Sequence, residues 1–148
     1  MKITKRFKWE MAHRLSFHKG KCYYLHGHSW SMKVSVEGRL DKHGFVMDFG
    51  DLKNIFNEIV EKNLDHSIML YKNDPILPFL KQAENERLEK EHRSLNIVTV
   101  PFEPTSENIS KYLFEKFNKE VMKETLGRCK VNRVKVYETE SSEAVYYG

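Results

Sequence analysis

The chain has 148 residues, a length typical of one domain, and it is 40% hydrophobic and 31% charged, a composition typical of a folded globular protein. No apolar run approaches the roughly 20 residues that cross a bilayer, and no apolar stretch follows the basic start, so we expect neither a membrane segment nor a secretory signal. The 25 basic and 21 acidic residues are interleaved and give a net charge of +4, which by itself does not indicate a nucleic-acid partner.

The first third of the chain predicts strands, because apolar and polar side chains alternate along it. Phe7, Trp9 and Met11 fall on one side and polar residues on the other, the period of two of a half-buried strand. In chain order we expect a strand at 3–13, a loop at 15–25, a strand at 28–37, a turn at 41–44 and a short strand at 45–47.

Further along, the apolar spacing changes to three and four residues, which is typical of amphipathic helices. One helix is expected over residues 49–60, with Asp48 or Asp51 as its N-cap, and a second over 109–122, introduced by Pro104. The remaining expected elements are a solvated helix at 79–93 and strands at 96–100, 134–136 and 144–147.

This order of elements predicts one α+β domain over residues 1–148, with a largely antiparallel sheet and helices on one face. A long, highly charged insert occupies about residues 67–103. Because the helices cover only one face of such apolar strands, we expect the chain to form a homo-oligomer.

Three histidines form the sharpest chemical pattern. His26 and His28 are two residues apart at the start of a strand, so their rings share a face, and His13 has the inward parity of the first strand. If the two strands pair, the three imidazoles converge as in a tetrahedral zinc site with one open position. Iron, nickel or copper would also accept these ligands, and the alternative is that each ring is an ordinary core or surface histidine.

Cys22 lies in the predicted loop, four residues before His26 and among lysines. A thiol close to a dication is favoured as a thiolate, which acts as a base or a nucleophile, whereas a lone cysteine is otherwise a small buried apolar residue. Cys129 has no such neighbours and is expected to be structural. Two cysteines this far apart indicate no disulfide framework, so we expect a cytoplasmic protein.

Two further acidic positions point to proton chemistry or ligand binding. Asp65 precedes His66, and a carboxylate beside an imidazole makes a proton shuttle near neutral pH, although such a pair also occurs at ordinary helix ends. Glu138 continues the inward parity of Val134 and Val136. A buried carboxylate needs a donor, so we expect either an internal Arg or Lys, or a ligand with a paired N–H edge.

Six segments occur together in an order found in a known family. They are Met11–Leu15, Cys22–His28, Gly44 through Phe49, Leu64–His66, Pro104–Asn108 and Tyr137–Thr139, followed by a terminal strand with tyrosines. On these motifs the chain resembles the 6-pyruvoyltetrahydropterin synthase/6-carboxytetrahydropterin synthase family over essentially its whole length. The long insert is a departure from the family's short members.

The resemblance implies a tunnelling fold, in which an antiparallel four-stranded sheet carries two helices on one face and subunits join into a barrel. Hexamers built from two trimers, with active sites at subunit boundaries, are typical of the family. By motif, one Zn²⁺ per subunit would be bound by His13, His26 and His28. The resemblance also implies that Cys22 is a base and that Asp65 and His66 form a proton relay. It implies that Glu138 anchors the pterin and joins that relay, and that Thr105, Ser106 and Glu107 line the pterin pocket.

The gap between Cys22 and His26 resembles that of the bacterial carboxy-forming members of the queuosine pathway. The implied reaction converts 7,8-dihydroneopterin triphosphate to 6-carboxy-5,6,7,8-tetrahydropterin, acetaldehyde and triphosphate. Pyruvoyl formation from the same substrate is the alternative, and a non-catalytic pterin-binding relative is another. A zinc-stabilised nucleic-acid-binding module is disfavoured, because the aromatic residues face inward and only three ligands are found.

Overall fold

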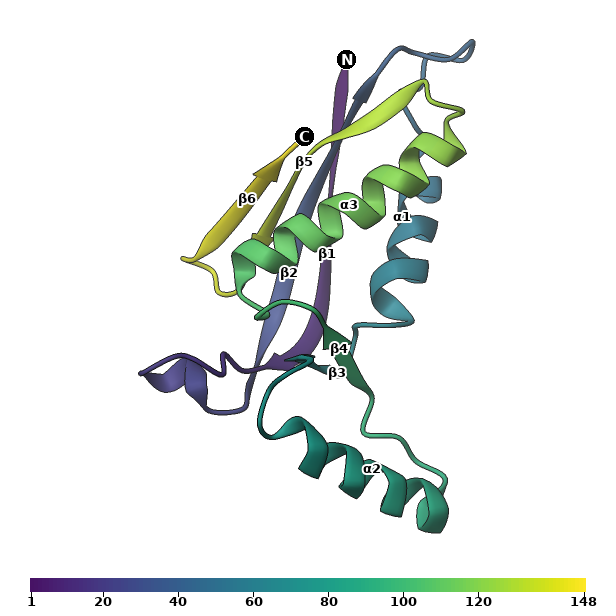
Figure 1. Ribbon diagram of the computed structural model, residues 1–148. Helices are drawn as coiled ribbons and strands as arrows, with labels where there is room; N and C mark the ends of the chain where they lie inside the picture. Colours follow the sequence, from purple (N-terminus) through teal and green to yellow (C-terminus); the bar gives the residue numbers. More distant parts are fainter.

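A six-stranded sheet is the frame of the molecule, and the computed structural model describes all residues, 1–148 (Figure 1). The strands are β1 (Lys2–His13), β2 (His26–Gly38), β3 (Ser67–Tyr71), β4 (Ile97–Val100), β5 (Cys129–Tyr137) and β6 (Glu143–Tyr147). The helices are α1 (Phe49–Phe56), which continues as a π-helical turn over Asn57–Glu61, α2 (Leu77–Glu91) and α3 (Ser106–Glu124). None of the helices has the length and apolarity needed to cross a bilayer.

The two long N-terminal strands pair antiparallel in a register that aligns their inward residues. Trp9 lies opposite Trp30, and Met11 lies opposite His28. His13, at the end of β1, lies opposite His26, with which β2 begins. The strands expected at 3–13 and 28–37 are confirmed as β1 and β2, and β2 starts early enough to include both of its histidines.

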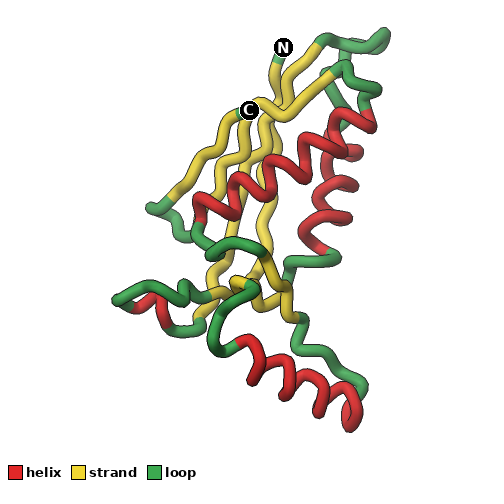
Figure 2. The backbone as a smooth tube through the Cα atoms, viewed as in Figure 1, coloured by secondary structure: helices red, strands yellow, loops and turns green.

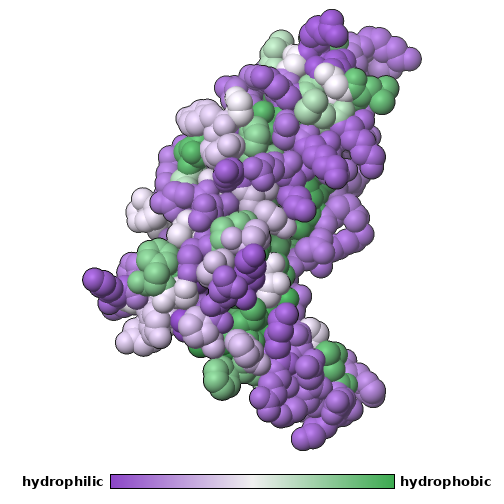
Figure 3. Space-filling model, viewed as in Figure 1, coloured by the Kyte–Doolittle hydropathy of each residue, from purple (hydrophilic) through white to green (hydrophobic).

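The sheet is mixed, in the order β4-β3-β1-β2-β5-β6, with β3 parallel to both β1 and β4. The expectation of a four-stranded antiparallel sheet was therefore wrong in these two strands. The helix expected at 79–93 and the strand expected at 96–100 are confirmed as α2 and β4. Together with β3 they make the charged insert a β3-α2-β4 unit, since two parallel neighbours require a crossover such as α2. α2 extends away from the rest of the molecule and forms a largely hydrophilic lobe, at the bottom of Figure 3.

α1 and α3 lie on the same face of the sheet, as expected (Figure 2). Asp48 is the N-cap of α1, since its side chain accepts a hydrogen bond from the Gly50 N–H. The core between the helices and the sheet includes Trp30, Leu52 and Phe117, all fully buried. This packing places the inward residues of β1 and β2, and with them the histidines, on the helix-covered side.

The short strand expected at 45–47 is not present, so that prediction was wrong. Val46 and Met47 are buried apolar residues, but the carbonyls of this segment bond to side chains instead of a strand. The Phe45 carbonyl accepts from Arg128, and the Val46 carbonyl accepts from the Cys129 thiol. The apolar run therefore marks burial and not strand pairing.

Candidate functional site

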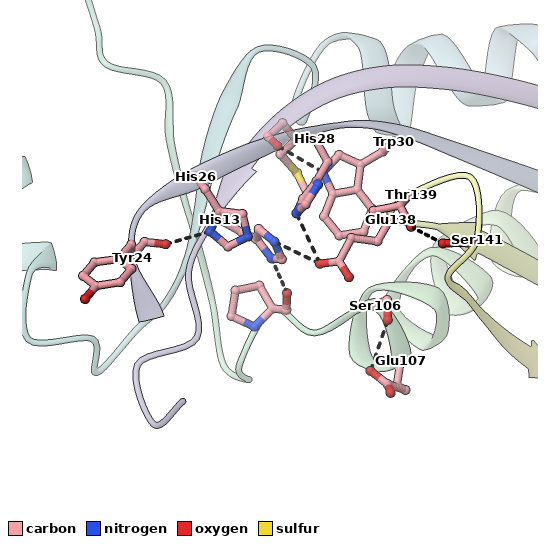
Figure 4. Close-up of polar contacts among 12 residues, drawn as sticks. His13, Tyr24, His26, His28, Trp30, Ser106, Glu107, Glu138, Thr139 and Ser141 are labelled. Carbon is pink, nitrogen blue, oxygen red and sulfur yellow. Dashed lines mark hydrogen bonds and ion pairs between the residues drawn. The ribbon is translucent and has the colours of Figure 1, made fainter. Parts of the chain in front are cut away.

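The three histidines of the sequence motif converge at one end of the sheet (Figure 4). His13 comes from the end of β1, and His26 and His28 come from the start of β2. Glu138, directly after β5, completes the group, and one ligand atom of each of the four residues lies within 4.8 Å of all the others. The predicted convergence of the three imidazoles is confirmed.

Backbone carbonyls orient two of the rings. His13 Nδ1 lies 2.8 Å from the Pro104 carbonyl oxygen, and His26 Nδ1 lies 2.7 Å from that of Tyr24. A carbonyl oxygen only accepts hydrogen bonds, so each Nδ1 carries the proton and each Nε2 keeps its lone pair. This outer contact is the usual way in which metal-binding histidines are held.

The inner side of the group is arranged to face a cation. Glu138 Oε1 lies 3.2 Å from His13 Nε2 and 3.5 Å from His28 Nε2. Both nitrogens are buried and neither has an aligned hydrogen-bond partner. Lone pairs that face a carboxylate inside the protein repel it unless a cation lies between them, either a metal ion or a proton on the ring nitrogen. The donor set therefore fits a divalent metal, and three imidazoles with one open position suit Zn²⁺.

The electrostatics keep these groups in their metal-binding forms. The contact with His13 holds the pKa of Glu138 below its ordinary value, so this group is a carboxylate at neutral pH. Burial lowers the pKa of His28, so its ring is neutral. The sequence led us to expect an Arg, a Lys or a ligand opposite Glu138, whereas the polar groups that face it in the chain are the two imidazoles of His13 and His28.

Asp65 and His66 form the predicted pair, but they are not part of the four-residue histidine group. Asp65 Oδ2 accepts from His66 Nδ1 at 2.8 Å, and its Oδ1 accepts from the Glu10 backbone N–H at 2.8 Å. His66 lines a shallow depression with Glu10, Ser29 and also His28, so one residue of the histidine group borders the same depression. The His66 side chain is 76% exposed. Within one chain, the pair is therefore exposed and separate from the ligand group.

Replacing Asp65 with asparagine is expected to reduce stability by about 1 kcal/mol at pH 7, because it removes a charge-assisted hydrogen bond. Partial burial raises the pKa of Asp65, but the hydrogen bonds from Glu10 and His66 lower it further, below its ordinary value. A carboxyl with a depressed folded-state pKa stabilises above the unfolded value of about 4 and loses this effect as the pH falls. Urea denaturation should show the two proteins converging in acid. A difference in the free energy of unfolding that stayed constant across pH would contradict this expectation. Glu89→Gln, which changes an exposed carboxylate on α2, is the control.

Cys22 lies in the loop between β1 and β2, as expected, within a short 3-10 turn over Lys21–Tyr23 (Figure 1). It is half-buried, and its carbonyl accepts from the Leu15 N–H at 2.8 Å. The thiol is not part of the four-residue ligand group. Cys129 is buried in the core cluster, in keeping with a structural role.

The Pro104–Glu107 segment lies beside the histidine group, since the Pro104 carbonyl holds His13 (Figure 4). The Thr105 side chain caps α3 by accepting from the Asn108 N–H, and Ser106 donates to Glu107. Sequence reasoning missed the part that the Pro104 and Tyr24 carbonyls play. Backbone carbonyls leave no side-chain signal, so only their places within the two motifs could have indicated them.

The fold and the site define an α+β protein with a histidine-rich group, at the end of two paired strands, that could hold a metal ion. A profile described as 6-pyruvoyl tetrahydropterin synthase matches residues 2–148, and the chain belongs to this family of enzymes. The resemblance seen in the sequence is thereby confirmed.

Curated relatives are similar over nearly their whole length. A 6-carboxy-5,6,7,8-tetrahydropterin synthase from Aquifex aeolicus is 33% identical, covering 97% of this chain and 96% of the relative. Another, from Haemophilus influenzae, is 31% identical, covering 98% and 97%. Among solved structures, an uncharacterized Wolinella succinogenes protein has a TM-score of 0.83 at 28% identity, covering 100% of this chain and 98% of that one. A Plasmodium vivax 6-pyruvoyl tetrahydropterin synthase has a TM-score of 0.71 at 22% identity, with the same coverage, and supports the fold alone.

Proposed function

We propose that the chain is a zinc-dependent lyase that converts 7,8-dihydroneopterin triphosphate to 6-carboxy-5,6,7,8-tetrahydropterin, releasing acetaldehyde and triphosphate, in queuosine biosynthesis. The observation that carries the proposal is the meeting of three imidazoles and the Glu138 carboxylate in one group that could hold a metal ion. The curated relatives that carry the carboxy-forming name support the choice of product.

His13, His26 and His28 would hold one Zn²⁺ per subunit through their Nε2 atoms. Zinc, when bound, supplies a Lewis acid that polarises the side-chain oxygens of the substrate and acidifies the adjacent groups. The buried position of the His13 ring and its bond to Pro104 hold the first ligand rigidly. Substrate would reach the metal from the side of His26 and His28, because these two residues are only half-buried.

Proton transfer falls to Cys22, Asp65 and His66. Cys22 removes a proton from the substrate, and His66, oriented by Asp65, returns one. Because the Asp65–His66 pair is not part of the ligand group of its own chain, one subunit's pair would serve a neighbour's zinc site. This requirement supports a homo-oligomer, proposed as a hexamer of two trimers with active sites at subunit boundaries.

Glu138 and the Thr105–Glu107 segment would bind the pterin. A carboxylate accepts two parallel N–H donors of an amino-pyrimidinone edge bidentately, and Glu138 is held as a carboxylate beside the metal ligands. The Thr105 hydroxyl caps α3, so within this segment Ser106 and Glu107 would make the contacts with the pterin. Glu138 would in addition take part in the proton relay.

Incubating the purified protein with 7,8-dihydroneopterin triphosphate tests the proposal. We expect one acetaldehyde per triphosphate released, and a pterin product with the mass of the 6-carboxy compound. A chelator should abolish the reaction, and added Zn²⁺ should restore it. Triphosphate release without acetaldehyde would instead indicate pyruvoyl formation, and no turnover with retained pterin binding would indicate a non-catalytic relative.

A further inference from the structure

Two carboxylates from the charged insert reach the loop that carries Cys22. Asp74 lies in the turn between β3 and α2, and Glu103 lies after β4, so they stand at opposite ends of the crossover β3-α2-β4. Asp74 contacts Arg14, and Glu103 contacts Ser16. These contacts join segments that are far apart in the sequence.

The first contact is a buried ion pair. Arg14 Nε lies 2.9 Å from Asp74 Oδ2, and the two side chains are 6% and 0% exposed. Both atoms are buried, and neither has an aligned hydrogen-bond partner. On its other side, the Arg14 guanidinium lies over the ring of Tyr23, 4.5 Å from its centroid, and Tyr23 directly follows Cys22. Removing one partner of a buried ion pair leaves an uncompensated charge, so Arg14 depends on Asp74 for its position.

The second contact involves both oxygens of one carboxylate. Glu103 accepts from the backbone N–H of Ser16 at 3.0 Å and, through its other oxygen, from the Ser16 hydroxyl. Between these two tethers lies Leu15, whose N–H donates to the Cys22 carbonyl. Arg14, Leu15 and Ser16 thus connect Asp74 and Glu103 of the insert to the backbone of Cys22.

We propose that Asp74 and Glu103 are positioning residues that set the place of the Cys22 thiol through Arg14, Leu15 and Ser16. This inference rests on the proposed role of Cys22 as the base and assigns a task to the insert, which the sequence left unexplained. A displacement of about 1 Å at a reacting group costs up to about 100-fold in rate. Loss of a tether should therefore lower kcat more than it changes KM for the pterin.

The test uses Asp74→Asn, which keeps the Oδ1 acceptor for the Ile76 N–H but removes the charge, and Ser16→Ala, which removes one bond to Glu103. We expect kcat to fall about 10- to 100-fold, with zinc content unchanged. Hydrogen exchange of the 14–24 loop should speed up, and the alkylation rate of Cys22 should change, which can be followed alone because Cys129 is 2% exposed. Ser16→Thr, which restores the hydroxyl, should recover kcat, and Glu91→Gln on α2 is the matched control.

The proposal would be overturned if both folded variants exchanged their loop amides and alkylated Cys22 at the wild-type rates. A loss of kcat without a change in either rate would overturn it as well. If Asp74→Asn does not fold, Ser16→Ala alone decides, since it leaves the buried ion pair intact. Exchange and alkylation are measured without substrate. They therefore report on the tethers even if Cys22→Ala proves fully active, a result that would remove only the role of Cys22 as the base.

Discussion

Replacing His26 with alanine is expected to remove the bound metal and abolish turnover while leaving the fold intact. Loss of one of three nitrogen ligands should lower zinc affinity by more than about 100-fold, since even outer-shell changes cost about 10- to 100-fold. The ring is tilted against its neighbours and hydrogen-bonded only to the Tyr24 carbonyl. His13 is a poorer choice, because its side chain is fully buried and its removal would leave a cavity in the core.

Zinc content by elemental analysis, acetaldehyde release and circular dichroism are the three measurements. His43, exposed in the turn before α1, provides the matched control: His43→Ala should keep both zinc and activity. Full activity in a folded His26→Ala protein would show that the metal takes no part in the reaction. Loss of activity with one zinc still bound per chain would contradict the ligand role of His26.

Replacing Cys22 with alanine is expected to lower kcat by about 10²- to 10⁴-fold, the usual contribution of a general base. The thiol is outside the four-residue ligand group, so zinc should stay bound. The hydrogen bond from Leu15 goes to the Cys22 carbonyl, so the loop should keep its shape. Pterin binding, measured by fluorescence titration, should be unchanged.

Cys129→Ala is the control for the loss of a thiol. Its Sγ lies 3.0 Å from the Val46 carbonyl oxygen within the core, so this variant should melt at a lower temperature and keep its kcat. A Cys22→Ala protein with wild-type turnover would exclude the cysteine as the base. A variant that loses zinc together with activity would instead place the thiol near the metal.

The residues of the metal site could be predicted because they depend on local spacing. In a strand, side chains two residues apart share a face, so His26 and His28 had to project together. His13 joined them once β1 and β2 paired, and the alternation of both strands made an antiparallel pair the expected result. Glu138 was found by the same parity, although its partners were not, since they come from other strands.

The errors arose where burial and pairing were not visible along the chain. Ser67–Tyr71 is a strand without a regular alternation of burial, and it pairs in parallel with β1, so no local pattern marked it. The segment 45–47 was expected to be a strand because it is apolar. Its carbonyls instead accept hydrogen bonds from the side chains of Arg128 and Cys129.

Spacing alone was therefore enough to identify the paired strands β1 and β2, the helices α1 and α3, and the inward face that carries three imidazole rings, because each depends on residues close in sequence. That the Pro104 carbonyl orients His13, that Asp74 and Glu103 hold the cysteine loop, and that Asp65 accepts from the Glu10 backbone depend on contacts between residues 55 to 91 positions apart. Such contacts exist only once the sheet is assembled, since the energy of each depends on burial and alignment that a linear pattern does not encode.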